Sequence, residues 1–183
     1  MTCIVAIAEF GNVWMAGDRA AVENSHYLTH SDAPKVFLRG PFLIGYTTSF
    51  RMGQLLQYRL EWPQLPAEGD FDGFMATSFV DAVRGCLKDG GYTKIENSRE
   101  EVGTFLVGVA GRLYYFDDDY NVRRPLGDIA ACGSGMSVAL GSLHTSDKRE
   151  WHAPDRLLIA LEAASQFVTT VRAPFDVVRL PGA

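Results

Sequence analysis

The second residue of the sequence, Thr2, carries the most direct candidate chemistry in the chain. It follows the initial methionine and leads into residues 3–9, an apolar segment of strand character. Aminopeptidases remove a methionine that precedes a small residue, so we predict that Thr2 becomes the N-terminus. One residue would then hold a hydroxyl nucleophile and an α-amine that, with a pKa of about 8, could act as general base. The alternative is that Thr2 is merely the second residue of an ordinary cytosolic protein.

Three further residues occur where they could support this chemistry. Asp18 ends the predicted second strand, Lys35 begins a later strand, and Ser134 lies between two glycines. An ammonium group beside an α-amine lowers the pKa of that amine by like-charge repulsion, which keeps it able to accept a proton. We assign this role to Lys35, with Asp18 as its counterion. The alternatives are a surface lysine on an edge strand, a turn aspartate, and a Gly-Ser-Gly turn before a helix.

The other reactive side chains favour structural roles. Cys3 could act as a thiol nucleophile only after a second cleavage, and its place inside a strand favours buried packing. The acidic residues at 117–119 indicate a solvated turn, because no calcium-loop spacing surrounds them. The three cysteines and four histidines show no metal-ligand spacing. We therefore predict no metal site and no cofactor.

Length and composition restrict the class of protein. A chain of 183 residues with 47% hydrophobic residues can fill one core, so we expect a single domain over residues 1–183. The net charge of −5 and the absence of a basic run argue against nucleic acid as a partner. The apolar runs are short and interrupted, and no leader sequence precedes them, so we expect a cytoplasmic protein without membrane spans.

The order of predicted elements indicates two antiparallel sheets with helices outside them. Strands are predicted in blocks, as hairpins over residues 3–16 and 104–116, with further strands at 34–38, 42–47, 129–132 and 175–178. Helices are predicted at 49–60, 72–88, 136–144 and 154–168. Residues 21–33 are expected to form a loop or a short irregular strand, and residues 92–101 an exposed loop. This arrangement argues against alternating βαβ units with a parallel sheet.

Thr2, Ala16-Gly17-Asp18, Lys35, the apolar strand that ends near residue 48 and Gly133-Ser134-Gly135 occur in the order found in one protease family. The chain thereby resembles the proteasome β-subunit and the HslV peptidase, which are N-terminal nucleophile (Ntn) hydrolases. The resemblance implies an α+β fold, a four-layer αββα sandwich of two antiparallel sheets flanked by helices. It also implies a threonine-type peptidase or amide hydrolase with Thr2, Asp18, Lys35 and Ser134 as catalytic residues.

The resemblance also suggests how a substrate would be held. The relatives use the backbone N–H of a glycine after the apolar strand as oxyanion donor, and the matching stretch here is Thr47-Thr48-Ser49. Ser49 is predicted to supply that N–H, although the glycine is missing. Thr47 and Arg51 are expected to line the pocket beside Thr2, and Gly133 and Gly135 to let the backbone pass close to it. The relatives have an Asp or a polar pair after the last helix that braces the nucleophile and the serine. The matching stretch here has no carboxylate, and Thr169 or Gln166 could replace it by neutral hydrogen bonds.

The relatives assemble as stacked rings and receive unfolded chains from an AAA+ ATPase. The resemblance therefore implies a homo-oligomeric ring, a peptide or unfolded-protein substrate and an AAA+ unfoldase as partner. The apolar faces of residues 49–60 and 72–88 are candidate assembly surfaces, and the loop at 88–101 is a candidate partner contact. Two alternatives remain open: an inactive ring or scaffold protein of the same fold, and an Ntn amidase that does not cleave peptides.

Overall fold

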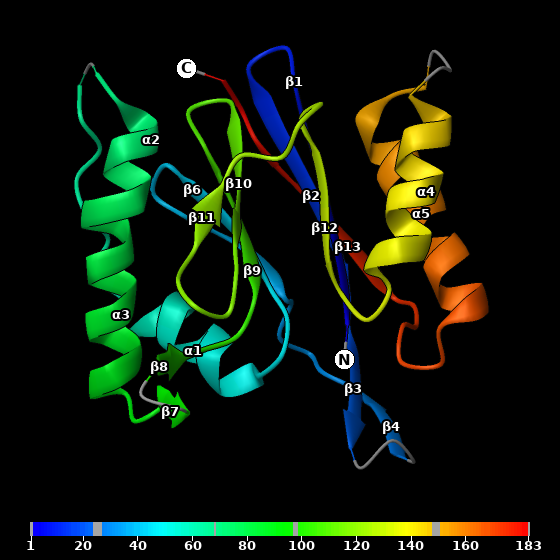
Figure 1. Ribbon diagram of the computed structural model, residues 1–183. Coiled ribbons are helices and arrows are strands. Elements are labelled where there is room, and N and C mark those ends of the chain that lie inside the picture. Colours follow the sequence, from blue (N-terminus) through cyan, green and yellow to red (C-terminus); the bar gives the residue numbers. More distant parts are fainter. Residues whose placement is uncertain (1, 24–26, 68, 97–98, 148–150, 183) are drawn as a thin grey trace.

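The computed structural model describes residues 2–23, 27–67, 69–96, 99–147 and 151–182. Two antiparallel sheets lie face to face, and helices cover their outer faces (Figure 1). The first sheet has the strand order β12-β1-β2-β13 and the second the order β11-β10-β9-β6-β5. The strands of the first sheet are β1 (Cys3–Glu9), β2 (Asn12–Asp18), β12 (Ile129–Gly133) and β13 (Phe175–Leu180). Those of the second are β5 (Val36–Arg39), β6 (Phe42–Tyr46), β9 (Phe105–Val109), β10 (Arg112–Phe116) and β11 (Val122–Arg123).

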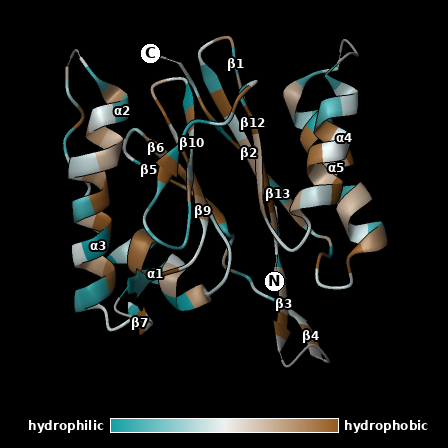
Figure 2. Ribbon diagram, viewed as in Figure 1, coloured by the Kyte–Doolittle hydropathy of each residue, from teal (hydrophilic) through white to brown (hydrophobic). Residues whose placement is uncertain are grey.

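Three clusters of buried hydrophobic residues correspond to the three interfaces between these layers. Ile4, Met15 and Leu43 belong to the cluster between the two sheets. A second cluster joins the first sheet to α4 (Met136–Ser146) and α5 (Ala153–Phe167). The third joins the second sheet to α1 (Phe50–Tyr58) and α3 (Val80–Asp89). Hydrophobic residues accordingly concentrate on the strands and on the helix faces turned toward them (Figure 2). The predicted αββα sandwich is therefore the observed architecture.

The apolar helix faces that the sequence suggested as assembly surfaces are used inside the protein. Met52 and Leu55 of α1, and Val83 and Leu87 of α3, are all buried against the second sheet. The hydrophobic pattern of these helices thus results from their packing against the second sheet. The prediction that these faces form interfaces between copies is wrong.

The first hairpin positions the two ends of its strands side by side. β1 and β2 pair with Ile4 opposite Gly17, and Phe10 and Gly11 make the turn with φ values of 48° and 76°. Two consecutive positive φ angles are typical of a tight hairpin turn. Because the strands are equally long, the end of β2 returns to the start of β1. Asp18 therefore lies beside Thr2 and Cys3, as the predicted hairpin register requires.

Several predicted segments differ in detail from the structure. The helix expected at 72–88 is composed of α2 (Phe71–Phe74), a π-helical turn (Met75–Phe79) and α3. Residues 92–101 were expected to be a loop, but they contain the paired strands β7 (Lys94–Glu96) and β8 (Arg99–Glu101). The segment 92–101 has two Lys or Arg residues, three Glu residues and few apolar ones, so its sequence does not show a strand pattern that depends on pairing across a short turn.

A second small hairpin occupies the region where the sequence indicated a loop or an irregular strand. β3 (Ala20–Glu23) pairs with β4 (Tyr27–His30), and this hairpin projects beyond the two large sheets (Figure 1). β3 begins two residues after Asp18, and the chain returns from β4 toward Lys35. The hairpin therefore separates two candidate catalytic residues along the chain while its base keeps them close in space.

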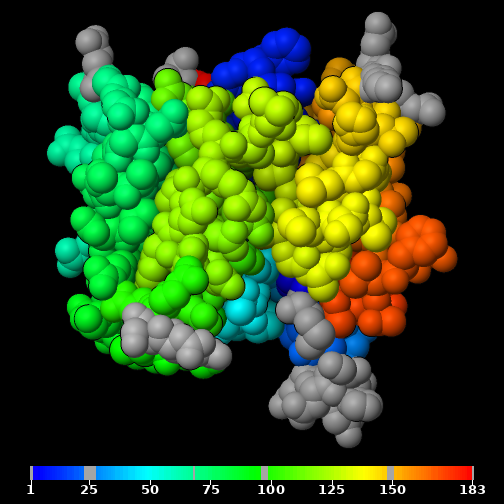
Figure 3. Space-filling view, in the orientation of Figure 1, coloured from blue at the N-terminus to red at the C-terminus, as the bar shows by residue number. Residues whose placement is uncertain are grey.

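The side of the molecule seen in Figure 3 is covered mainly by α3, the segment around β10–β12 and α4. The start of the chain, in dark blue, emerges mainly at the end where β1 turns into β2. The opposite end of β1, where Thr2 lies, is enclosed by neighbouring segments, and Thr2 has only 2% of its surface exposed. Among the described residues, no helix is both long enough and apolar enough to span a bilayer.

Candidate active site

Thr2 lies directly before β1, where backbone and side chain are both held by hydrogen bonds. Its N–H donates to Ser134 Oγ over 3.2 Å, and its carbonyl accepts from Ser134 Oγ at 3.2 Å and from the Gly135 N–H at 3.4 Å. Its hydroxyl oxygen Oγ1 accepts a hydrogen bond from Lys35 Nζ. The candidate nucleophile thus contacts two of the three residues that the sequence selected with it.

Lys35 lies immediately before β5, and its ammonium group is enclosed by oxygen atoms. Besides Thr2 Oγ1, Nζ donates to Asp18 Oδ2 over 3.2 Å and to the Ala20 carbonyl over 2.6 Å. Its three N–H donors therefore each have an acceptor. The side chain is only 3% exposed. Burial lowers the pKa of Lys35 below its ordinary value, and the Asp18 carboxylate opposes that shift.

Asp18 is the counterion of Lys35 and also fixes the backbone around the site. It is completely buried; Oδ1 accepts from the Cys3 N–H at 2.9 Å and Oδ2 from the Ala20 N–H at 3.0 Å. One carboxylate thus connects the start of β1, the start of β3 and the ammonium group of Lys35. Lys35 is therefore not a surface lysine and Asp18 is not an exposed turn aspartate, which were the alternatives considered from the sequence.

A glycine at position 17 allows the two sheets to approach closely enough for this contact. A Cβ atom on Gly17 would lie 2.6 Å from Ile4 Cδ1 and 3.1 Å from Val36 Cγ2. Val36 begins β5 in the second sheet, and Gly17 lies in β2 of the first. A larger residue at 17 would push β5 away, and Lys35 with it.

Ser134 is held by the hydroxyl group of Thr170, whereas the sequence suggested Thr169 for this role. Ser134 Oγ lies 2.8 Å from Thr170 Oγ1. Either hydroxyl can donate in this contact. Thr170 is buried, whereas the predicted Thr169 and Gln166 are exposed. The loop after α5 turns only one of two adjacent threonines inward, and residue type could not reveal which.

Gly133 is required at its position, because its φ of 90° is unfavourable for a residue with a side chain. A Cβ atom there would collide with the Thr2 carbonyl oxygen and lie 3.1 Å from Thr47 Cγ2. At Gly135, a Cβ atom would lie 2.7 Å from Cys3 Cβ. Both glycines therefore let the backbone pass close to Thr2, which is the function that the sequence suggested for them.

The segment from Thr47 to Ser49 differs from the predicted oxyanion site. The Ser49 N–H donates to the Thr47 carbonyl over 2.7 Å, so it is not available to a substrate in this conformation. Thr48, between them, has a φ of 67°, which is rare for a β-branched residue. No group among the described residues accepts a hydrogen bond from the Thr48 N–H. The prediction that Ser49 offers a free amide is wrong, and the Thr48 amide is the unoccupied donor of this turn.

Thr47, Arg51 and Phe50 lie around the same turn but differ in their surroundings. Thr47 is buried, and its hydroxyl bonds the Thr104 carbonyl and the Thr104 hydroxyl, each over 2.8 Å. Arg51 is exposed, and its backbone N–H donates to Ser49 Oγ, the N-cap of α1. Phe50 was not selected from the sequence, yet its ring centroid lies 5.6 Å from Lys35 Nζ. A single aromatic residue at a helix start gives no sequence signal for this role.

The cysteines are arranged as structural residues. Burial is the main cause that raises the pKa of the Cys3 thiol to about 12, so the thiolate is scarce at neutral pH. Cys132 is also completely buried, and its pKa is raised by burial. No group of three or more His, Cys, Asp or Glu residues with metal-site geometry occurs in the described part of the chain.

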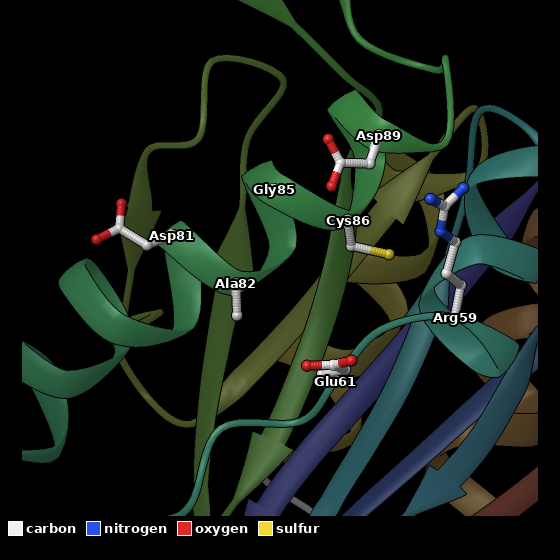
Figure 4. A pocket seen from close by; sticks show the side chains of 7 residues that line it. All are labelled: Arg59, Glu61, Asp81, Ala82, Gly85, Cys86 and Asp89. Carbon is white, nitrogen blue, oxygen red and sulfur yellow. The ribbon is translucent and has the colours of Figure 1, made fainter.

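A separate cleft of about 420 Å³ lies outside this constellation (Figure 4). Arg59 and Glu61 after α1 line one side of it, and Asp81, Cys86 and Asp89 of α3 the other. None of these residues touches Thr2, Asp18, Lys35 or Ser134, and the sequence analysis selected none of them.

No protein-family profile and no curated protein sequence matches this chain. Solved structures do match it. The Thiobacillus denitrificans protein BPH, solved in complex with epoxomicin, has a TM-score of 0.82 at 17% identity, with complete coverage of both chains. Eukaryotic HslV from Trypanosoma brucei has a TM-score of 0.70 at 20% identity, covering 97% of this chain and 98% of that one.

A third similar structure is the helical assembly of the Anbu complex from Pseudomonas aeruginosa. It has a TM-score of 0.69 at 16% identity and covers 97% of this chain and 80% of that one. Anbu is described as an ancestral β-subunit in the Yersinia bercovieri structure. The chain therefore has the proteasome-type Ntn hydrolase fold, which confirms the predicted fold class. At these identities the similarity establishes the fold alone.

Proposed function

We propose that this protein is an N-terminal-threonine hydrolase that cleaves peptide bonds in peptides or unfolded chains. The contact that carries the proposal is the hydrogen bond from the buried Lys35 ammonium to Thr2 Oγ1, with Asp18 as the buried counterion. An isolated buried ammonium is costly, so a pair of this kind next to a hydroxyl needs a reason. Activation of that hydroxyl for attack supplies one.

The reaction begins once Met1 is removed and Thr2 has a free α-amine. Thr2 Oγ1 attacks the substrate carbonyl, and the α-amine takes the hydroxyl proton. The carbonyl oxygen becomes an oxyanion, for which the Thr48 N–H is the available donor in the turn. The amine then protonates the leaving nitrogen as the C–N bond breaks, which leaves an ester on Thr2. Water activated by the same amine hydrolyses this ester and restores the hydroxyl.

The surrounding residues keep the amine in a reactive state and in place. The Lys35 cation disfavours protonation of the nearby amine by like-charge repulsion. Ser134 Oγ accepts a hydrogen bond from the Thr2 nitrogen, and the hydroxyls of Ser134 and Thr170 are hydrogen-bonded to each other. We propose that this neutral chain braces Thr2 and Ser134, a task for which the resemblance implies an Asp or a polar pair.

The protein is proposed to work as a homo-oligomer. One similar structure is a helical assembly. Assembly would enclose the Thr2 site, which has no feature of its own that excludes folded proteins as substrates. The ring form, the AAA+ unfoldase partner and the cytoplasmic location remain predictions from the sequence. Light scattering at micromolar concentration tests the assembly, and a monodisperse monomer would contradict it.

Intact mass and peptide turnover test the proposed activity together. We expect the purified protein to lack Met1, to gain one covalent adduct at Thr2 with an epoxyketone, and to cleave fluorogenic peptides. Thr2→Ala should abolish both adduct and cleavage. Retention of Met1 without an adduct would indicate the inactive scaffold, and an adduct without peptide cleavage would indicate an amidase for other substrates.

A matched pair of variants tests the hydrogen-bond chain behind Thr2. Thr170→Val removes the hydroxyl that bonds Ser134 and keeps the side-chain shape, so we expect kcat to fall about tenfold. Thr169→Val makes the same change at an exposed position and should leave kcat within about twofold of the wild type. Equal activity of the two variants would contradict the role of Thr170.

A further inference from the structure

Arg19 is the single residue between Asp18 and Ala20, whose oxygen atoms accept hydrogen bonds from the Lys35 ammonium. Asp18 ends β2 and Ala20 begins β3, and both accept a hydrogen bond from Lys35 Nζ. The backbone of Arg19 is bonded on both sides. Its N–H donates to the Pro174 carbonyl over 3.1 Å, and its carbonyl accepts from the Ser31 N–H at 3.0 Å. The position of Arg19 therefore sets the positions of both acceptors.

The guanidinium group of Arg19 reaches two further parts of the chain. Nε donates to Asp176 Oδ2 over 2.8 Å and Nη2 to Asp176 Oδ1 over 2.7 Å, which is a bidentate ion pair. Nη1 donates to the Asp32 carbonyl over 2.8 Å. Asp176 lies in β13, and Asp32 lies three residues before Lys35. Arg19 thus ties the acceptors of the Lys35 ammonium to the segment that carries Lys35.

This ion pair is more shielded than an exposed pair such as that between Arg99 and Asp119. The side chains of Arg19 and Asp176 are 27% and 21% exposed, whereas those of Arg99 and Asp119, joined over 2.8 Å, are 67% and 35% exposed. A pair that is shielded and bidentate restricts geometry more than a flexible exposed pair does. The planar fork of arginine is needed for this, because a lysine has one point charge and cannot hold two carboxylate oxygens and a carbonyl in one plane.

We propose that Arg19, oriented by Asp176, is a positioning residue that holds the Asp18 carboxylate and the Ala20 carbonyl in register with Lys35. The proposal rests on the proposed function, since it concerns the geometry around Thr2 Oγ1. Displacement of a catalytic group by a fraction of an ångström slows the chemical step more than it weakens substrate binding. The expected signature is therefore a lower kcat with an unchanged KM.

Arg19→Lys and Asp176→Asn test this in the full-length protein processed at Thr2. Each should lower kcat at least tenfold while KM stays within about twofold of the wild type. Asp32→Ala is the matched control, because the carbonyl that accepts from Arg19 remains and only the exposed carboxylate, 3.8 Å from Nη1, is lost. Its kcat should stay within about twofold. Thermal melting of each variant identifies those that fold.

The outcomes separate this proposal from the proposed function. If the wild type neither cleaves peptides nor forms the adduct, the proposed function has failed. If the wild type is active and a folded Arg19→Lys or Asp176→Asn variant keeps its kcat, or loses only in KM, the positioning role is overturned while the proposed function stands. Should Arg19→Lys not fold, Asp176→Asn decides, since it keeps the bond from Arg19 to the Asp32 carbonyl.

Discussion

The buried ion pair between Asp18 and Lys35 permits a test that needs no substrate. Asp18 accepts from the Cys3 N–H, the Ala20 N–H and Lys35 Nζ, and it has no exposed surface. Asp18→Asn keeps the size of the side chain, removes its charge and replaces one acceptor oxygen by an NH₂ donor. At least one buried donor then loses its acceptor, and the Lys35 ammonium loses its counterion.

The expected loss in the free energy of unfolding is large. Removal of one partner of a buried pair costs about 3–5 kcal/mol, because the other charge is left buried without compensation. We expect a loss in this range for Asp18→Asn at neutral pH. In the double variant Asp18→Asn/Lys35→Met the stranded charge is gone. This variant should recover at least half of the loss, since a buried pair contributes little relative to an apolar replacement.

The pH dependence has a definite sign. The pKa of Lys35 is lowered in the folded protein, mainly by burial, relative to an ordinary value of 10.5. The unfolded chain therefore binds the proton more readily, and stability rises as pH increases from the lowered pKa toward 10.5. The Asp18 carboxylate raises this pKa, so its loss lowers the pKa further. The deficit of Asp18→Asn should be largest at neutral pH and should shrink as the pH rises toward 10.5, because the variant's lysine, with the lower pKa, loses its proton first.

Urea unfolding followed by circular dichroism measures these differences, at one protein concentration because assembly would shift apparent stability. Wild type, Asp18→Asn and the double variant are compared at pH 7 and at pH 10. A loss below about 1 kcal/mol at pH 7 would refute the reasoning, as would a loss of equal size at both pH values. Either result would mean that the ammonium group is solvated or has another counterion.

Two further predictions concern the turn before α1. Thr48→Gly should raise the free energy of unfolding by about 1 kcal/mol, because the φ of 67° no longer strains a β-branched residue. Urea unfolding measures this change. A lower free energy of unfolding would show that the hydrogen bond from the Thr104 N–H to the Thr48 hydroxyl stabilises the protein by more than the strain destabilises it. Phe50→Ala should move the basic limb of the pH–rate profile to higher pH, because Lys35 becomes more hydrated and burial is the main cause of its lowered pKa. Phe50→Leu, which keeps the site covered, should move it less, and an unchanged profile in both variants would contradict the argument.

The sequence alone was sufficient to predict the layers and the central residues of the site. Residues 3–16 contain two apolar segments joined by a turn signal, as a hairpin does, so Asp18 was expected beside the start of β1, where the structure has it. Thr2, Lys35 and Ser134 could be selected from their residue types, from their places at strand ends and between glycines, and from an order along the chain that resembles one protease family. These features depend on local pattern and residue type, which a sequence displays directly.

The tertiary structure decided which neighbouring residue does each task. Thr170 faces Ser134 while Thr169 faces solvent, and the Thr48 amide is unoccupied while the Ser49 amide is bonded. Adjacent residues in a loop differ only in the direction in which the backbone turns them. That direction depends on contacts with residues far along the chain, such as those of Thr170 with Ser134 and of Thr48 with Thr104. Local patterns carry no information about such contacts, and only the packed sheets bring the partners together.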